Sequence, residues 1–151
     1  MLARTERLCM KLLDYARNCT YSVWVESPMS KPMMILVAGP YRSGTGDDPK
    51  LMAQNLQRLE SVSYAIFRAG HIPMIGEWVA LPIWRTAGGE KVGDALYNEI
   101  LHPTAGRLLQ RCDAVLRLEG TSVGADNDVK IATELGLPVY FRIEDVPGAS
   151  S

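Results

Sequence analysis

This 151-residue sequence has few cysteines, almost no net charge and no long apolar run. The 3 cysteines form no Cys-x-x-Cys pair and cannot all join in disulfides, so we expect a reducing compartment, the cytoplasm. A formal net charge of −1 gives no basis for binding a nucleic-acid polymer. No apolar run reaches the roughly 20 residues of a membrane-spanning helix. Arg4, Glu6 and Lys11 interrupt the stretch where a signal peptide would be apolar, so we expect no membrane partner.

Composition and length fit a single globular domain preceded by a short N-terminal segment. Hydrophobic residues make up 47% of the chain and charged residues 22%, which is enough apolar material for one core. We place an N-terminal extension at residues 1–32, with a helix predicted at 3–16 and a proline-containing linker at 27–32. The extension is either an added helix that covers the sheet or a partner, or a stretch wrongly included before a natural start at Met29. The main domain spans residues 33–151.

Strand-like and helix-like segments alternate along the main domain. Short apolar runs predict buried strands at residues 34–38, 72–75, 114–118 and 139–142. Helical spacing of apolar residues predicts helices at residues 49–70, 94–101 and 105–111, the last two interrupted at Pro103. Residues 78–84 form either a short helix or an irregular lid, and residues 88–91 form a mobile loop. The alternation predicts an α/β fold, a doubly wound, flavodoxin-like parallel sheet of four or five strands with flanking helices.

Parallel sheets bind ligands beyond the carboxyl ends of their strands, so the loops that follow the strands are the candidate site. In the loop after the first strand, Gly39 allows close approach of the backbone, Tyr41 can stack on a base, and Arg42 can bind a phosphate. The alternative is a tight turn with a solvated arginine. Gly39 and Gly44 have the spacing of a phosphate-binding P-loop, but Thr45 replaces the required lysine, which excludes that motif.

The most informative segment is residues 120–140, which reads as a loop, a helix, a Gly-Leu-Pro break and a new strand. We expect Asp128 in the first turn of that helix, beside backbone N–H groups that face a bound anion and keep the carboxylate ionised. Ser122 and Gly124 lie just before it, where a phosphate or a sugar can approach the backbone. The structural alternatives are Ser122 as a turn or cap residue, Asp126 as the helix N-cap, and Asp128 as an acid favoured by the helix dipole.

The same segment resembles the nucleophile motif of the nucleoside 2-deoxyribosyltransferase superfamily. The shared pattern is a serine, a glycine, an acid, an alanine and a glycine at fixed spacing, here Ser122, Gly124, Asp128, Ala132 and Gly136. The resemblance extends over residues 35–140 and is closest to a phage and bacterial branch of unknown function. We expect neither a metal nor a cofactor.

The resemblance implies a double displacement at the anomeric carbon, C1′, of a nucleoside or nucleoside monophosphate. A carboxylate, here Asp128, attacks C1′ and displaces the base, and water or a second base then resolves the sugar ester. The first loop would hold the sugar and phosphate, and Ser122 would bind the 5′-phosphate. Superfamily members commonly form dimers, so we expect a homodimer. Its candidate interface is the apolar run from Trp78 to Trp84, whose two tryptophans are otherwise base-stacking or core residues.

Two departures from the superfamily pattern bear on catalysis. Asp128 is one methylene shorter than the usual glutamate, and a placement error of ~1 Å can lower a rate on the order of a hundredfold. The second acid of the superfamily lies eight residues before the aspartate that leads the third strand, here Asp113, and that position holds Ala105. The candidate substitutes as proton donor are Glu77, Glu99 and His102. We predict Glu77, because it follows the second strand and can face the site.

Two functions therefore remain open. The first is an N-deoxyribosyltransferase or nucleoside 5′-monophosphate N-glycosidase, with Asp128 and Glu77 as catalytic residues. Its predicted substrate-binding residues are Gly39, Tyr41, Arg42, Ser122 and Gly124. The second is a catalytically silent nucleotide-binding protein with a regulatory role.

Overall fold

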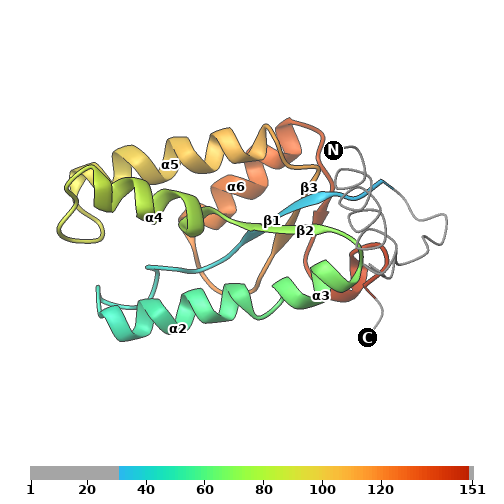
Figure 1. Ribbon diagram of the computed structural model, residues 1–151, viewed down its shortest axis with the longest axis horizontal. Coiled ribbons are helices and arrows are strands. Elements are labelled where there is room, and N and C mark those ends of the chain that lie inside the picture. Colours follow the sequence, from blue (N-terminus) through green and yellow to red (C-terminus); the bar gives the residue numbers. More distant parts are fainter. Residues whose placement is uncertain (1–30, 150–151) are drawn as a thin grey trace, which may run out of the picture. The chain divides into compact units, whose positions relative to one another are not determined.

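A parallel sheet organises residues 31–149, the part of the chain that this computed structural model describes. Its strands are β1 (Met34–Ala38), β2 (Ile72–Ile75), β3 (Ala114–Arg117) and β4 (Val139–Tyr140), paired in the order β2-β1-β3-β4. Every pairing is parallel, which confirms the predicted doubly wound α/β fold, with four strands in the described part (Figure 1). The helix predicted at 3–16 and residues 1–30 of the predicted extension lie outside the described residues.

Helices cover both faces of the sheet. In chain order they are α2 (Pro49–Glu60), α3 (Ser63–Arg68), α4 (Gly76–Thr86), α5 (Ala95–Leu109) and α6 (Val123–Glu134). Ile35 and Val37 of β1 lie in a core with side chains of α2 and α3, whereas Leu36 and Ala38 pack with α5 and α6. Figure 1 shows α2 and α3 on one side of the sheet and α5 and α6 on the other. The chain therefore leaves β1 toward one face and returns to β3 by way of the other.

The prediction of a single helix at residues 49–70 is wrong, because α2 and α3 are two separate helices. α2 begins as predicted, with Pro49 at its first position and Asp48 as the N-cap that accepts the Lys50 N–H at 2.8 Å. It ends where the Ser61 hydroxyl donates a hydrogen bond to the Arg58 carbonyl at 2.7 Å. That carbonyl is the one a continuing helix would use for the next backbone N–H, so the serine side chain competes with the helix.

The second half of the chain confirms one prediction and corrects two others. Residues 78–84 are helical, which was one of the two predicted alternatives, and they form the middle of the longer helix α4. The helix break predicted at Pro103 is wrong, since α5 runs continuously through it. Proline removes one backbone donor, but Tyr97 and Leu109 are buried on either side of it and hold both halves of the helix in place. β4 is shorter than predicted, because the short 3₁₀ helix η1 (Ile143–Asp145) follows it closely.

A buried histidine ties the start of the sheet to the C-terminal segment. His71, only 4% exposed, accepts the Met33 N–H at Nδ1 over 3.2 Å, and its Nε2 lies 2.8 Å from the Pro147 carbonyl. Only the neutral ring with its proton on Nε2 satisfies both partners. We expect His71→Ala to lower the free energy of unfolding by about 1–3 kcal/mol, because it leaves two backbone groups unpaired. Urea unfolding measures this loss.

His102→Ala is the matched control for that measurement, because His102 is exposed on α5 and makes no such bridge between backbone segments. We expect its unfolding midpoint to stay near that of the wild type. Equal midpoints for His71→Ala and the wild type would contradict the bridging role of His71.

Candidate functional site

The carboxyl ends of β1 and β3 lie side by side at the centre of the sheet. Ala38 and Arg117 are register partners, and the Leu118 N–H donates to the Ala38 carbonyl at 2.8 Å. The connections leave these two strands toward opposite faces, which opens a crevice between their loops. A cavity of about 400 Å³ lies there.

All seven predicted site residues line this cavity. They come from three connections and the helices that follow them, and they are Gly39, Tyr41, Arg42, Glu77, Ser122, Gly124 and Asp128. We expected these residues to lie together only because the carboxyl ends of parallel strands share one edge of a sheet. The structure therefore brings the predicted residues to one cavity, which is large enough for a small ligand.

The helix that carries Asp128 begins earlier than expected. Ser122 is its N-cap: its side chain is buried, and its Oγ accepts the Ala125 N–H at 3.3 Å. Asp126 is the acid of the first turn, and Asp128 is the sixth residue of α6. The prediction that Asp128 lies in the first turn is therefore wrong, and so is the expectation that free N–H groups of the helix start keep it ionised.

Burial dominates the electrostatics of Asp128 instead. It raises the pKa of the Asp128 carboxyl from 3.8 to about 6, although the charges of His102 and Arg117 act in the opposite direction. Asp128 therefore ionises only as the pH rises through about 6. Such a carboxylate is poorly solvated, which is the state that a nucleophile requires.

Glu77 is the second titratable carboxyl in the cavity. It lies in the first turn of α4, directly after β2. The pKa of the Glu77 carboxyl is raised from 4.5 to about 7, mainly by burial. A hydrogen bond from the backbone N–H of Glu77 lowers this pKa, and the charge of Asp128 raises it. The two carboxyls therefore interact across the cavity. Between about pH 6 and pH 7 the favoured state is an ionised Asp128 with a protonated Glu77.

The loop after β1 is held by its own side chains. Arg42 pairs with Asp47 through two hydrogen bonds, Nε to Oδ1 at 2.7 Å and Nη2 to Oδ2 at 3.2 Å. The buried Thr45 hydroxyl donates to the Arg42 carbonyl at 2.6 Å and accepts the Asp47 N–H at 3.2 Å. Asn55 of α2 donates to the Tyr41 carbonyl at 2.8 Å. Arg42 thus lines the cavity as a cation held by Asp47, and its side chain is still 41% exposed to solvent.

One face of α5 completes the cavity. Asn98, His102 and Ala105 follow one another at spacings of four and three residues, and all three line it. Glu99, on another side of the helix, is exposed and does not line it. Of the candidate proton donors, Glu77 and His102 are therefore in place. Ala105 faces the cavity at the position where the resemblance expects an acid.

Sequence reasoning missed four polar lining residues, Ser43, Asp47, Tyr97 and Asn98. Asn98 could have been predicted from sequence, because its helical spacing to His102 puts both side chains on one face of the helix. Asp47 follows two glycines in a predicted ligand loop, which is a weaker signal. Tyr97 is buried beside Glu77, and burial together with that charge raises the pKa of its phenol, so it remains a hydrogen-bond donor.

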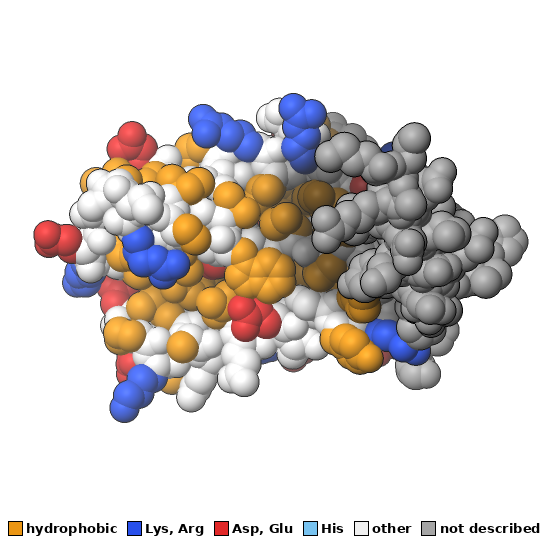
Figure 2. All heavy atoms as spheres, viewed as in Figure 1, with side chains coloured by type: hydrophobic (Ala, Val, Ile, Leu, Met, Phe, Trp, Pro, Cys, Tyr) orange, Lys and Arg blue, Asp and Glu red, His pale blue; other side chains and the backbone are white. Residues whose placement is uncertain are grey.

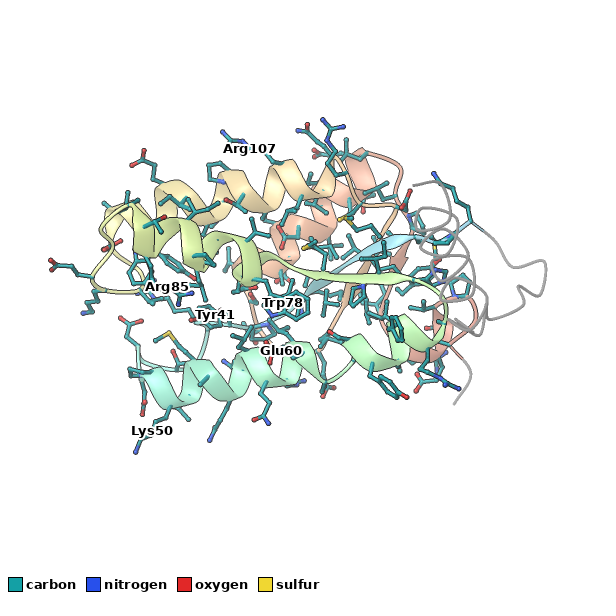
Figure 3. All side chains as sticks on the ribbon, viewed as in Figure 1. Tyr41, Lys50, Glu60, Trp78, Arg85 and Arg107 are labelled. Carbon is teal, nitrogen blue, oxygen red and sulfur yellow. The ribbon has the colours of Figure 1, made fainter. Side chains whose placement is uncertain are left out.

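Neither tryptophan of α4 lines this cavity. Trp84 is a core residue, with its ring in a T-shaped contact with Tyr97 at 6.1 Å between centroids. Trp78 is 40% exposed, and its indole N–H donates to Glu60 of α2 at 2.8 Å (Figure 3). Figure 2 shows apolar side chains gathered over α4, where Trp78 and Ile83 are among the exposed large hydrophobic residues.

Within residues 31–149, no three His, Cys, Asp or Glu side chains are grouped so that they could hold a metal ion. No helix in that range has the length and apolar character needed to cross a bilayer. Comparison with protein-family models gave no match, and a search of curated proteins gave none either. The cavity and its side chains are therefore the basis for assigning a function.

Proposed function

We propose that this chain breaks the N-glycosidic bond of a (deoxy)nucleoside or its 5′-monophosphate, by hydrolysis or by transfer of the sugar to a second base. The observation that carries the proposal is the pair of carboxyls, Glu77 and Asp128, in one cavity at the carboxyl edge of the sheet. Their pKa values, raised to about 7 and about 6, favour one proton on Glu77 and one negative charge on Asp128. This is the division into acid and nucleophile that glycosidic cleavage requires.

The reaction follows from these two groups. A carboxylate oxygen of Asp128 bonds to C1′ while the bond from C1′ to the base nitrogen breaks, and Glu77 gives its proton to the departing base. The product is a sugar ester of Asp128 and an ionised Glu77. Glu77 then takes a proton from water or from a second base, whose oxygen or nitrogen bonds to C1′ and releases the Asp128 carboxylate. Two displacements retain the configuration at C1′.

The remaining lining residues suit the rest of the substrate. Helix geometry leaves the N–H groups of Val123 and Gly124 without intrahelical acceptors, and the Ser122 side chain lies beside them in the cavity. Asp47 occupies the Nε side of the Arg42 guanidinium, so Nη1 keeps its donors for an anion. These donors are complementary to a 5′-phosphate, and the Tyr41 ring is complementary to a base.

Replacement of Arg42 separates phosphate recognition from nucleoside recognition. We expect Arg42→Ala to weaken binding of the nucleoside monophosphate by roughly 10- to 100-fold, because a charge-assisted hydrogen bond is lost, and to leave the nucleoside almost unaffected. Titration calorimetry with both ligands measures this difference. Arg107→Ala is the control, since Arg107 lies on the outer side of α5 (Figure 3). Equal weakening of both ligands, or no weakening, would argue against a phosphate partner for Arg42.

We also propose that the chain acts in the cytoplasm as a homo-oligomer. Trp78 is 40% exposed and Ile83 is 45% exposed, so α4 presents large apolar side chains at the surface. A second copy of the chain is a suitable cover for them.

A catalytically silent nucleotide-binding protein is the second candidate. One observation favours it: Ala105 lines the cavity where the resemblance expects the proton donor. The short side chain of Asp128 also favours a catalytically silent protein. In this case the cavity would bind a nucleotide without breaking it.

Base release distinguishes the two candidates. The test uses purine and pyrimidine nucleosides with ribose or deoxyribose, each with and without a 5′-phosphate, and separates free base by chromatography. Release of a base supports the enzyme. Calorimetric binding without release supports the silent protein, and the absence of both would overturn the proposed ligand class.

A further inference from the structure

The Arg42 guanidinium is held by a second contact besides its ion pair with Asp47. The backbone of Gly93, in the loop between α4 and α5, lies against it. A side chain at Gly93 would place its first carbon 2.2 Å from Cζ of Arg42, 2.4 Å from Nη2 and 2.6 Å from Nε. An approach to the edge of the group would bring a nitrogen nearer than Cζ. Gly93 therefore covers one face of the guanidinium plane.

The loop that carries Gly93 is fixed to both of the helices it joins. Asp94 is the N-cap of α5, and its Oδ1 accepts the Tyr97 N–H at 2.6 Å. The same oxygen lies 3.3 Å from the indole nitrogen of Trp84 in α4, which donates to it. The Asp94 N–H donates to the Lys91 carbonyl at 3.0 Å. Gly93 itself has a φ of +92°, a conformation that favours glycine. Its position beside Arg42 is therefore set by α4 and α5.

Asp47 restrains the same guanidinium at its edge. Its carboxylate accepts Nε at 2.7 Å and Nη2 at 3.2 Å. Asp47 has a φ of +65°, which is uncommon for a residue other than glycine, and the Thr45 hydroxyl accepts its N–H in that conformation. With Gly93 on one face and Asp47 at the Nε and Nη2 edge, Nη1 is the nitrogen that neither of them engages. Two loops far apart in sequence thus determine how Arg42 lines the cavity.

We infer that Gly93 is a positioning residue for phosphate recognition, because its lack of a side chain lets the guanidinium lie where Nη1 can reach a 5′-phosphate. The inference rests on the proposed function, which assigns the phosphate contact to Arg42. Gly93 does not line the cavity, so it acts through Arg42. Arginine has a long side chain with many rotamers, so a methyl group at residue 93 displaces the guanidinium more readily than the backbone.

Titration calorimetry of Gly93→Ala tests this with the common deoxynucleoside 5′-monophosphates and their parent nucleosides. We expect roughly tenfold weaker binding of the monophosphate, because the displaced guanidinium loses a charge-assisted hydrogen bond, and unchanged binding of the nucleoside. Gly88→Ala is the matched control. Gly88 lies in the same loop with a φ of +90°, but a side chain there would meet open space. This variant carries the same backbone strain and should bind like the wild type. Equal weakening in both variants would overturn the inference.

A double variant with Arg42→Ala separates the contact with Arg42 from any other effect of the methyl group. The guanidinium is then absent, so Gly93→Ala should not weaken monophosphate binding beyond the loss in Arg42→Ala alone. A further loss as large as in the wild-type background would contradict the inference. If Gly93→Ala alone does not fold, recovery of the fold in the double variant supports the contact, and failure of both variants to fold contradicts it.

NMR of the Arg42 side chain provides a measurement that needs no ligand. The Nε–H resonance is assigned as the one absent from Arg42→Ala, and its hydrogen bond to Asp47 should slow its exchange with water. We expect this exchange to become several-fold faster in Gly93→Ala and to keep the wild-type rate in Gly88→Ala. If the wild type binds no monophosphate, the proposed ligand fails, while the exchange rates still decide whether Gly93 positions Arg42. An unchanged rate in Gly93→Ala would show that it does not.

Discussion

Asp128→Asn should abolish base release while leaving the fold intact. The amide matches the carboxylate in shape but cannot bond to C1′, so we expect turnover to fall by roughly a thousandfold or more. Burial raises the pKa of Asp128 to about 6, which means that its charged form destabilises the folded state above that pH. Asparagine removes this charge, so the variant should be at least as stable as the wild type at pH 7. Steady-state base release and thermal unfolding measure the two effects.

Glu134→Gln is the control for Asp128→Asn, since Glu134 is exposed at the far end of the same helix and does not line the cavity. Asp128→Glu is the complementary variant. It supplies the longer side chain found in the superfamily that residues 120–140 resemble, and we expect it to raise turnover. Full turnover in Asp128→Asn would assign the nucleophile to another residue.

Glu77→Gln should lower turnover by roughly 100- to 10,000-fold, because the departing base loses its proton donor. The pH profile should change as well. Activity in the wild type requires ionised Asp128 and is lost as the pH falls through about 6. It also requires protonated Glu77 and is lost as the pH rises through about 7. Glutamine cannot titrate, so the alkaline limb should disappear and the acidic limb should remain.

Glu99→Gln is the matched control for Glu77→Gln, since Glu99 is an exposed acid of α5 outside the cavity lining. An unchanged rate and profile in Glu77→Gln would rule out Glu77 as the donor. His102, which also lines the cavity, would then be the next residue to replace.

The sheet and the position of the site were predictable from sequence for a definite physical reason. The apolar runs at Met34–Ala38 and Ile72–Ile75 are short and each is followed directly by a glycine, and both became strands with the predicted limits. In a parallel sheet the carboxyl ends of strands share one edge, so loop residues far apart in sequence had to meet. That rule alone brought Gly39, Glu77 and Asp128 to one cavity.

The predictions that were wrong concern where helices begin and end, and these limits depend on competition between neighbouring side chains and backbone groups. Ser122 and Asp126 are both good helix caps, and sequence does not say which of them begins α6. The structure selects Ser122, because Asp126 is engaged by Arg117. The Ser61 hydroxyl ends α2 through a local hydrogen bond, which the spacing of apolar residues does not predict. Packing against the rest of the protein keeps α5 continuous across Pro103. The ion pair between Arg117 and Asp126 could not be predicted either, since it exists only once β3 and α6 are folded together.

Detection of a covalent sugar adduct tests the central claim most directly. A 2′-fluoro-substituted nucleoside, with or without its 5′-phosphate, slows the second displacement because the fluorine disfavours positive charge at C1′. The protein is then quenched, weighed intact by mass spectrometry and digested. We predict a mass increase of one fluorinated sugar, or sugar phosphate, on the peptide that contains Asp128, and none in Asp128→Asn. Release of base with no adduct on that peptide, or with the adduct on another residue, would contradict Asp128 as the nucleophile.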